Sequence, residues 1–198
     1  MFKSLTFANL TRLMVGLMFF GLAVSLIVEA HLGVPPWDVL AQGISLQLHI
    51  PFGTGVIIVS AIVLLAWIPL RLRPGFGSIA NAVLIGLWAN LFMNWIQPPT
   101  GYLNSVLMFL AGMVLISIAS GLYISAELGA GPRDGLMIGT AKHFDKPLWL
   151  VRTGYELLAL GIGWALGGQF REGTVFFALT IGYLMQRSIK FFRSWPAA

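Results

Sequence analysis

The sequence predicts an all-α integral membrane protein with six transmembrane helices, arranged as two inverted three-helix repeats. Composition is the first observation behind this prediction, because 58% of the 198 residues are hydrophobic, 10% are charged, and the mean hydropathy is +0.86. A soluble protein of this length needs more charge to cover its surface. An internal duplication is the second observation, and the placement of basic residues is the third.

The duplication is clearest in the segment AHLGVPPWDVLAQGIS at 30–45, which returns 96 positions later, at 126–141, as AELGAGPRDGLMIGTA. Shared Gly, Pro and Asp residues are not matches that an apolar composition produces by accident, and fixed-offset similarity indicates a repeat architecture. We expect one membrane domain over 1–198, with repeat one at 1–97 and repeat two at 98–198. The matches include Gly33/Gly129, Pro36/Pro132, Asp38/Asp134 and Gly43/Gly139, with weaker ones at Gly77/Gly173, Ile85/Ile181 and Gly86/Gly182.

The first repeat begins with an apolar run at 12–28 that is long enough to cross a bilayer, and we expect it to remain in the mature protein. Gly33, Pro35 and Pro36 then interrupt the chain, because proline cannot continue a helix that precedes it. A helix starting at Pro36 and ending near residue 48 is too short to span, so we expect it to be broken or re-entrant. Further spans are predicted at 55–70 and 78–96.

The second repeat is expected to follow the same order, with a first span at 103–125. A short helix from Pro132 to about residue 143 follows the second motif. The remaining spans are predicted at 148–167 and 173–186.

Basic residues predict the orientation. With the N-terminus in the cytoplasm, Arg171 is the basic residue that falls outside, in agreement with the excess of Lys and Arg in cytoplasmic loops. Three spans per repeat is an odd number, so the second repeat enters the membrane from the opposite side and both termini are cytoplasmic. The inner residues are Lys3, Arg12, Arg71, Arg73, Arg133, Lys142, Lys146, Arg152, Arg187, Lys190 and Arg193.

Asp38 and Asp134 are the main candidates for a binding site, since each follows a proline at a helix start where a span has been interrupted. In transporters built from inverted repeats, broken helices present their N-termini to a solute or a coupling ion near the bilayer midplane. A simpler alternative is that each Asp only caps its own short helix. The sequence leaves both interpretations open. The motif residues Gly33, Gly129, Pro36 and Pro132 belong to the same predicted site.

Four other positions complete the candidate set. Arg133 takes the place of Trp37 in the second copy and is expected either to pair with Asp134 or to hold an anionic group. Glu156 lies within a predicted span, where an ionisable group suggests function, although an ion pair with Arg152 is the alternative. Asn81 is expected to hydrogen-bond between helices or to contact the solute.

Several classes of function find no support. The sequence has no cysteine, which excludes disulfides and thiolate metal sites, and it has no P-loop, HExxH or convincing GxSxG motif. We therefore expect no enzyme activity, no metal and no cofactor. Nucleic-acid binding is not expected either, because the basic residues gather on one membrane face.

The two motifs resemble the YczE/YyaS/YitT group of small bacterial integral membrane proteins, which carry a glycine-rich turn with Pro and Asp after a hydrophobic span. The matching residues are Gly33, Pro36, Asp38, Gly129, Gly131, Pro132, Asp134 and Gly135. Pro35 departs from the pattern, since the second copy has Gly131 there. The resemblance implies a bacterial cytoplasmic (inner) membrane location and no cofactor, and it carries no defined activity.

We therefore predict a small-solute transporter that works by alternating access, coupled to a proton or cation, with an anionic or zwitterionic solute bound between the motif helices. The alternative is a non-transporting subunit or scaffold that captures a solute or binds a partner membrane protein, and a channel is a further alternative. Close helix packing through Gly163 and Gly167 is expected within the monomer or in a homodimer.

Overall fold

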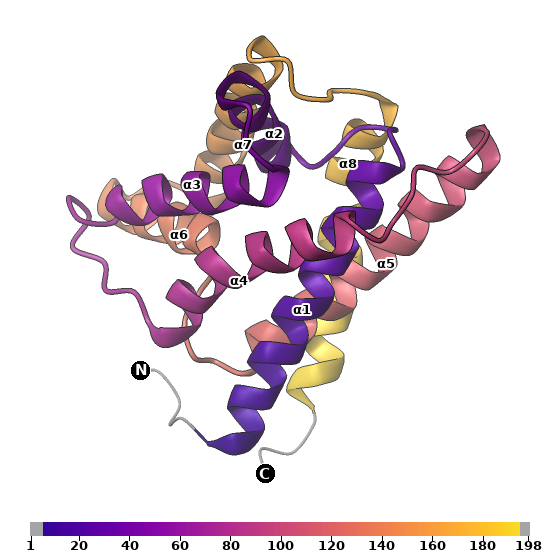
Figure 1. Cartoon of the computed structure of the whole chain (residues 1–198). Helices are drawn as coiled ribbons and strands as arrows, with labels where there is room; N and C mark the ends of the chain where they lie inside the picture. Colours follow the sequence, from indigo (N-terminus) through magenta and orange to yellow (C-terminus); the bar gives the residue numbers. More distant parts are fainter. Residues whose placement is uncertain (1–5, 195–198) are drawn as a thin grey trace.

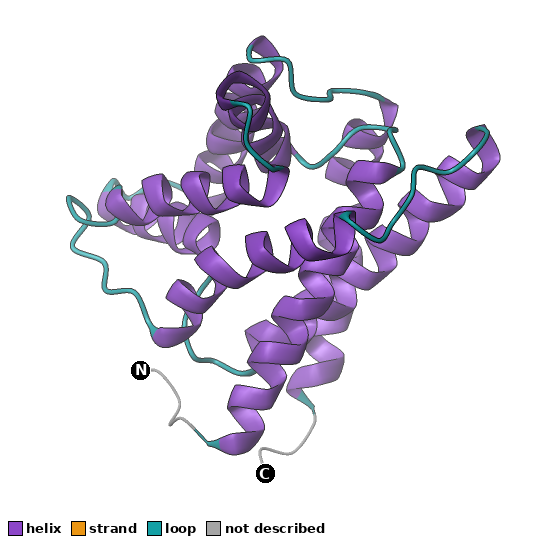
Figure 2. Cartoon of the chain, in the orientation of Figure 1, coloured by secondary structure: helices purple, strands orange, loops and turns teal. Residues whose placement is uncertain are grey.

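The computed structural model describes residues 6–194, and Lys3 lies outside them. This part of the chain consists of helices and connecting loops without a strand (Figures 1 and 2), so the all-α prediction is confirmed. Each long first helix is followed by a short one, at the positions that the motifs predict. The helices are α1 (Phe7–Glu29), α2 (Pro36–Leu48), α3 (Phe52–Leu65), α4 (Phe76–Met93), α5 (Tyr102–Ser125), α6 (Pro132–His143), α7 (Leu148–Ala165) and α8 (Glu172–Arg193).

Three of these helices, α1, α4 and α5, are long and apolar enough to cross a membrane. The consecutive helices α2 and α3, bent by 114° at their junction, together pass the same test and could form a fourth, broken span. Length and composition thus account for up to four of the six predicted spans among residues 6–194. Helix α3 has only 14 residues, and α7 and α8 carry charged residues within their length.

The backbone repeats at the same offset as the sequence. Helices α6, α7 and α8 begin 96 positions after α2, α3 and α4, at Pro132, Leu148 and Glu172. Left-handed residues recur in the same way, because His31, His49 and Arg71 match Glu127, Asp145 and Gly167, all with positive φ. Gly33 and Gly129 have φ values of 107° and 138°, a region that glycine enters without steric cost. The same local solution to the chain break therefore occurs twice.

The two halves are intertwined. The Gly77 N–H at the start of α4 donates to Leu128 O at 2.8 Å, and the Gly173 N–H at the start of α8 donates to Leu32 O at the same distance. Each motif loop is thus bound to the last helix of the other half. The short helices also cross over, since α2 packs on α7 and α6 packs on α3.

The axis of the molecule is the pair α1 and α5, which pack along much of their length (Figure 1). Glycines allow this approach, because a Cβ at Gly16 would meet the backbone of α5 and a Cβ at Gly112 would meet the backbone of α1. Helix α4 packs on α1, and its counterpart α8 packs on α5. The start of α1 and the end of α8 lie at the same end of the molecule.

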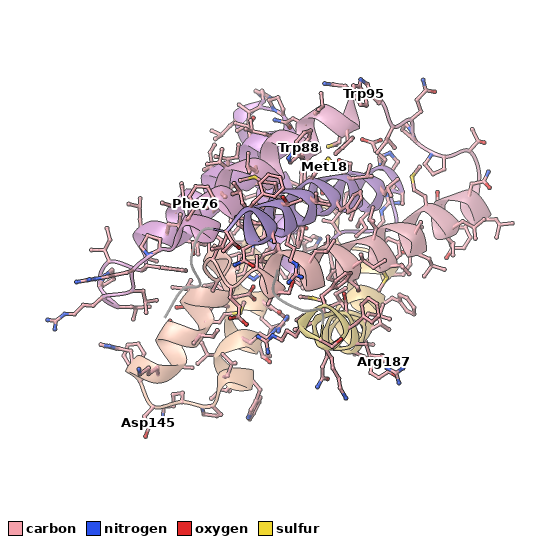
Figure 3. All side chains as sticks on the ribbon, turned by 90° about the horizontal axis from the view of Figure 1, so that it is seen from below. Met18, Phe76, Trp88, Trp95, Asp145 and Arg187 are labelled. Atoms are coloured by element: carbon pink, nitrogen blue, oxygen red, sulfur yellow. The ribbon has the colours of Figure 1, made fainter. Side chains whose placement is uncertain are left out.

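One contact breaks the correspondence between the halves. Helix α3 packs closely on α4, whereas α7 and α8, which occupy the equivalent positions in the second half, make almost no contact with each other. Burial differs accordingly, because α3 contributes a row of buried residues and α7 contributes Ala159 and Gly163. Figure 3 shows the molecule from below, with Asp145 labelled at the turn before α7 and Arg187 on α8.

Candidate functional site

A cavity of about 380 Å³ lies where the two chain breaks meet. The starts of α2 and α6 enter it from two sides, and α1, α3, α4, α5, α7 and α8 complete its wall. A volume of this size is typical of small-molecule sites, which also combine an apolar wall with a few polar groups. The predicted site residues in its lining are Pro36, Trp37, Asp38, Asn81, Pro132, Arg133, Asp134 and Glu156.

The lining follows the duplication. Every residue that the first half contributes has its counterpart, 96 positions later, in the same lining. A cavity lined by equivalent residues of both halves lies at the interface between the two repeats, which is where the binding sites of duplicated transporters are found. These pairs are Phe20/Ile116, Pro35/Gly131, Pro36/Pro132, Trp37/Arg133, Asp38/Asp134, Val56/Arg152, Ser60/Glu156, Asn81/Phe177 and Ile85/Ile181.

An ion pair joins the two motifs across this cavity. Arg133 Nη2 donates to Asp38 Oδ1 at 2.9 Å, and the side chain of Asp38 is 4% exposed while that of Arg133 is 23% exposed. The guanidinium also lies 5.6 Å from the centre of the Trp37 ring, within the range of a cation–π contact. The partner of Arg133 is thus the carboxylate of the other copy, and not the neighbouring Asp134 that the sequence suggested as one option.

Asp134 has a different environment from its counterpart. Its Oδ2 accepts a hydrogen bond of 3.3 Å from the hydroxyl of Tyr123 on α5, and no salt bridge to it occurs within residues 6–194. Neither motif carboxylate makes a side-chain cap to the start of its helix. The two carboxylates therefore make tertiary contacts at the cavity instead of the local capping bonds that the sequence left open.

A second charged pair lies on the wall formed by α7. Arg152 Nε donates to Glu156 Oε1 at 2.9 Å, which is the i,i+4 pair that the sequence gave as the alternative to a functional Glu156. Both residues also line the cavity, so the pair does not remove Glu156 from the site. Asn81 lines the opposite wall, on α4, and is buried.

The Trp37 indole has an unsatisfied donor behind the cavity wall. Trp37 is 8% exposed, and its Nε1 is buried without a hydrogen-bond partner in the part of the chain that the structure describes. A buried N–H usually finds an acceptor, because leaving it unpaired costs roughly 1–3 kcal/mol. Among residues 6–194, this donor is therefore an unpaired group in the packed wall of the cavity.

Two predicted residues are not in the lining. Gly33 packs against Arg171 and Thr174, and Gly129 packs against Ser78 and Gly75, so both shape the motif loops and seat them on the opposite half. Sequence reasoning also missed Tyr123, and it considered Arg152 only as the partner of Glu156. Comparing the copies position by position would have found both, since they replace the apolar Ile27 and Val56.

Comparison of the sequence with known proteins finds relatives that are themselves uncharacterised. Similar proteins are an uncharacterised protein of Haemophilus influenzae, 36% identical over 91% of this chain and 83% of its own, and the uncharacterised membrane protein YczE of Bacillus subtilis, 34% identical over 88% and 82%. The uncharacterised protein YyaS of Bacillus subtilis is 26% identical over 86% of this chain and 87% of its own. No solved structure matches.

A membrane location follows from the relative YczE and from the apolar helices, so the chain is a multi-pass membrane protein. Residues 7–190 match the family of unknown function DUF6198, a range that contains both motifs, the ion pair between them and the whole cavity lining. The YczE/YyaS-like resemblance is confirmed by these matches, and the chain belongs to the DUF6198 family.

Proposed function

We propose that this protein moves a small solute across the bacterial inner membrane by alternating access, with the solute bound between the starts of α2 and α6. The observation that carries the proposal is that Asp38 and Asp134, from chain breaks 96 positions apart, line one cavity. Ionisable groups within a membrane protein are costly and by default belong to a pathway or a binding site. Broken helices that meet at such a site are characteristic of carriers built from inverted repeats.

The arrangement that accompanies this function has six spans. In each half the first and last helices cross the membrane, and the short helix and its successor form a broken span between them. The matched helix starts of the two halves support this path, and α2 and α3 together are long and apolar enough for it. The basic residues favour cytoplasmic termini, which agrees with the common end reached by α1 and α8. The halves are then related by a pseudo-two-fold in the membrane plane.

The solute is anionic or zwitterionic in this proposal. The Arg133 guanidinium has five N–H donors, of which one is used by Asp38, and its side chain is 23% exposed at the cavity. These donors suit a carboxylate or another anionic group. Asp134, held by Tyr123, suits an ammonium group or a coupling proton or cation, and Glu156 is a further proton carrier.

Flux measurements in proteoliposomes test the proposal. The purified chain would be reconstituted alone, and proton or solute movement would be followed while zwitterionic and anionic metabolites are supplied in turn. We expect Asp38→Asn and Asp134→Asn to abolish flux and Asp145→Asn, in the exposed turn before α7, to retain it. Normal transport by both motif variants would contradict a binding site formed by Asp38 and Asp134. An absence of flux from the protein alone would favour a subunit that depends on a partner protein.

A further inference from the structure

The cavity extends further into the second half than into the first. Residues lining it from the second half without a counterpart from the first include Ala178, Gly182 and Met185, all on α8. Their equivalents on α4, Ala82, Gly86 and Ala89, are buried. The cavity thus runs along α8 through the positions that α4 uses for packing.

The contact that closes the first half has three parts. A Cβ at Gly53 would collide with Gly86 O and a Cβ at Gly86 with Gly53 O, so the two helices meet backbone to backbone. Beside them, Asn90 Oδ1 accepts from the Gly53 N–H at 2.7 Å and Asn90 Nδ2 donates to Thr54 Oγ1 at 3.2 Å. The carboxamide of α4 thereby caps the Gly53 N–H at the start of α3 and also binds the Thr54 hydroxyl.

The equivalent positions in the second half are apart. Gly182 is exposed, and a Cβ there would meet no atom within 4 Å. The counterpart of Asn90 is Gln186, another carboxamide, which is exposed, and the first turn of α7 has no side-chain cap. The counterpart of Gly53 is Trp149, whose bulk prevents an equally close approach. Glutamine is one methylene longer than asparagine, which suits a wider contact.

We propose that the start of α7 and the C-terminal half of α8 are a gate, open in this structure, which closes at Gly182 with the Gln186 carboxamide accepting from the Trp149 N–H. Closure of this gate accompanies the parting of α3 from α4 at Gly53 and Gly86. The inference rests on the proposed transport function and specifies its conformational change. With cytoplasmic termini, the structure is open to the cytoplasm, and the alternative state is open to the outside.

Because the chain contains no cysteine, introduced pairs can be cross-linked without a background. We expect Thr54→Cys/Asn90→Cys to form a disulfide readily, and Leu150→Cys/Gln186→Cys to form one more slowly as the gate closes. A chain carrying both pairs should form either cross-link but not both in one molecule. The control pair Gly161→Cys/Gln186→Cys should not react, since residue 161 lies roughly 16 Å further along α7. Failure of the 150/186 pair to react, or both cross-links in one molecule, overturns the gate.

Single cysteines give a second measurement that perturbs the fold less. Ala178→Cys on α8 should react rapidly with a water-soluble maleimide, and its counterpart Ala82→Cys on α4 should react about 10 to 1,000 times more slowly, as expected for a minor state populated at roughly 0.1–10%. Ala23→Cys, buried between α1 and α5, should not react. If Ala82→Cys is as inert as Ala23→Cys, α3 and α4 do not part and the gate is wrong.

The gate and the transport function can fail separately. If the 54/90 and 150/186 cross-links form as alternatives but no flux is observed, the proposed gate is supported and the transport function is contradicted. Flux that persists with the 54/90 cross-link fully formed would keep transport and reject the gate.

Discussion

The ion pair between Arg133 and Asp38 is the only salt bridge within residues 6–194 that joins the two motifs, and its removal gives a graded prediction. We expect Arg133→Gln to destabilise the protein more than Asp38→Asn. The Asp38 side chain is 4% exposed and would remain charged and unpaired in the first variant, whereas Arg133 is 23% exposed and borders the cavity. A buried charge that loses its partner is costly, but a partly hydrated one is less so.

The magnitude follows from this burial. Removing one partner of a fully buried pair costs about 3–5 kcal/mol, so we expect about 3 kcal/mol for Arg133→Gln. The hydrogen bond to a charged group is worth about 1.5–3 kcal/mol, and we expect the lower end for Asp38→Asn. For a chain of this length, 1 kcal/mol shifts Tm by about 2–4 °C, so both variants should be resolved by thermal unfolding in detergent.

A double-mutant cycle isolates the pair from its surroundings. The double variant should be more stable than Arg133→Gln alone, with a coupling energy of about 1.5–3 kcal/mol. Arg152 and Glu156 give a matched control, because their N–O distance is also 2.9 Å but their side chains are 48% and 29% exposed. That cycle should give about 0.3–0.5 kcal/mol. Equal coupling in the two cycles, or a larger loss for Asp38→Asn than for Arg133→Gln, would refute the reasoning.

Three further predictions concern packing and hydrogen bonds. Gly53→Ala should lower the free energy of unfolding by about 1–3 kcal/mol because it overpacks the contact with α4. The control Gly161→Ala, with open space around its Cα, should be neutral or stabilising by up to about 1 kcal/mol. Chemical denaturation measures both variants, and equal losses of stability would contradict the contact between α3 and α4. Trp67→Phe removes the 3.0 Å bond from the indole N–H to Pro132 O and should cost at least about 1 kcal/mol. A Tm equal to that of the unchanged protein would show that this bond does not hold α6 on the turn that follows α3. Tyr123→Phe loses the hydrogen bond to Asp134, which should lower Tm without solute because a bond to a charged group is worth about 1.5–3 kcal/mol. The same variant should also reduce the Tm shift that a zwitterion produces in a thermal-shift screen. An unchanged solute-induced shift would exclude Asp134 from the ligand contacts.

Much of this fold was predictable because the interruptions of its helices are caused by residues at the interruptions themselves. Gly33, Pro36 and their counterparts impose a helix end and a helix start whatever surrounds them, and the structure places α2 and α6 at the predicted starts. The 96-residue offset also predicted which positions correspond. The six predicted spans are supported in part, since length and composition identify up to four, and the bend between the short helices α2 and α3 depends on packing and not on hydropathy.

Other features depend on contacts between residues distant in sequence. Nothing local to Arg133 indicates that it reaches Asp38, 95 positions away, in preference to the adjacent Asp134. The loose contact between α7 and α8 has only a partial signal in the sequence, since Gly86 and Gly182 are identical although only the first is packed, while Gly53 is replaced by Trp149. Duplication predicts equivalent positions, and it cannot predict which of two equivalent contacts is made in a given state.

Divergence between the copies suggests how a solute would lie. At the cavity the second half has Tyr123, Arg133, Arg152 and Glu156, where the first half has Ile27, Trp37, Val56 and Ser60. Charged groups are therefore concentrated where α6 and α7 meet Asp38 at the start of α2, while Phe20, Val56 and Ile85 form an apolar part of the lining. An apolar surface favours hydrocarbon, and the charged surface favours ionic groups. A bound zwitterion should consequently place its charged head toward α6 and its apolar part toward Val56 and Ile85. Val56→Ala enlarges the cavity at its apolar side and should shift the preference toward solutes with bulkier apolar groups without loss of binding. An equal effect on the binding of all solutes would contradict this orientation.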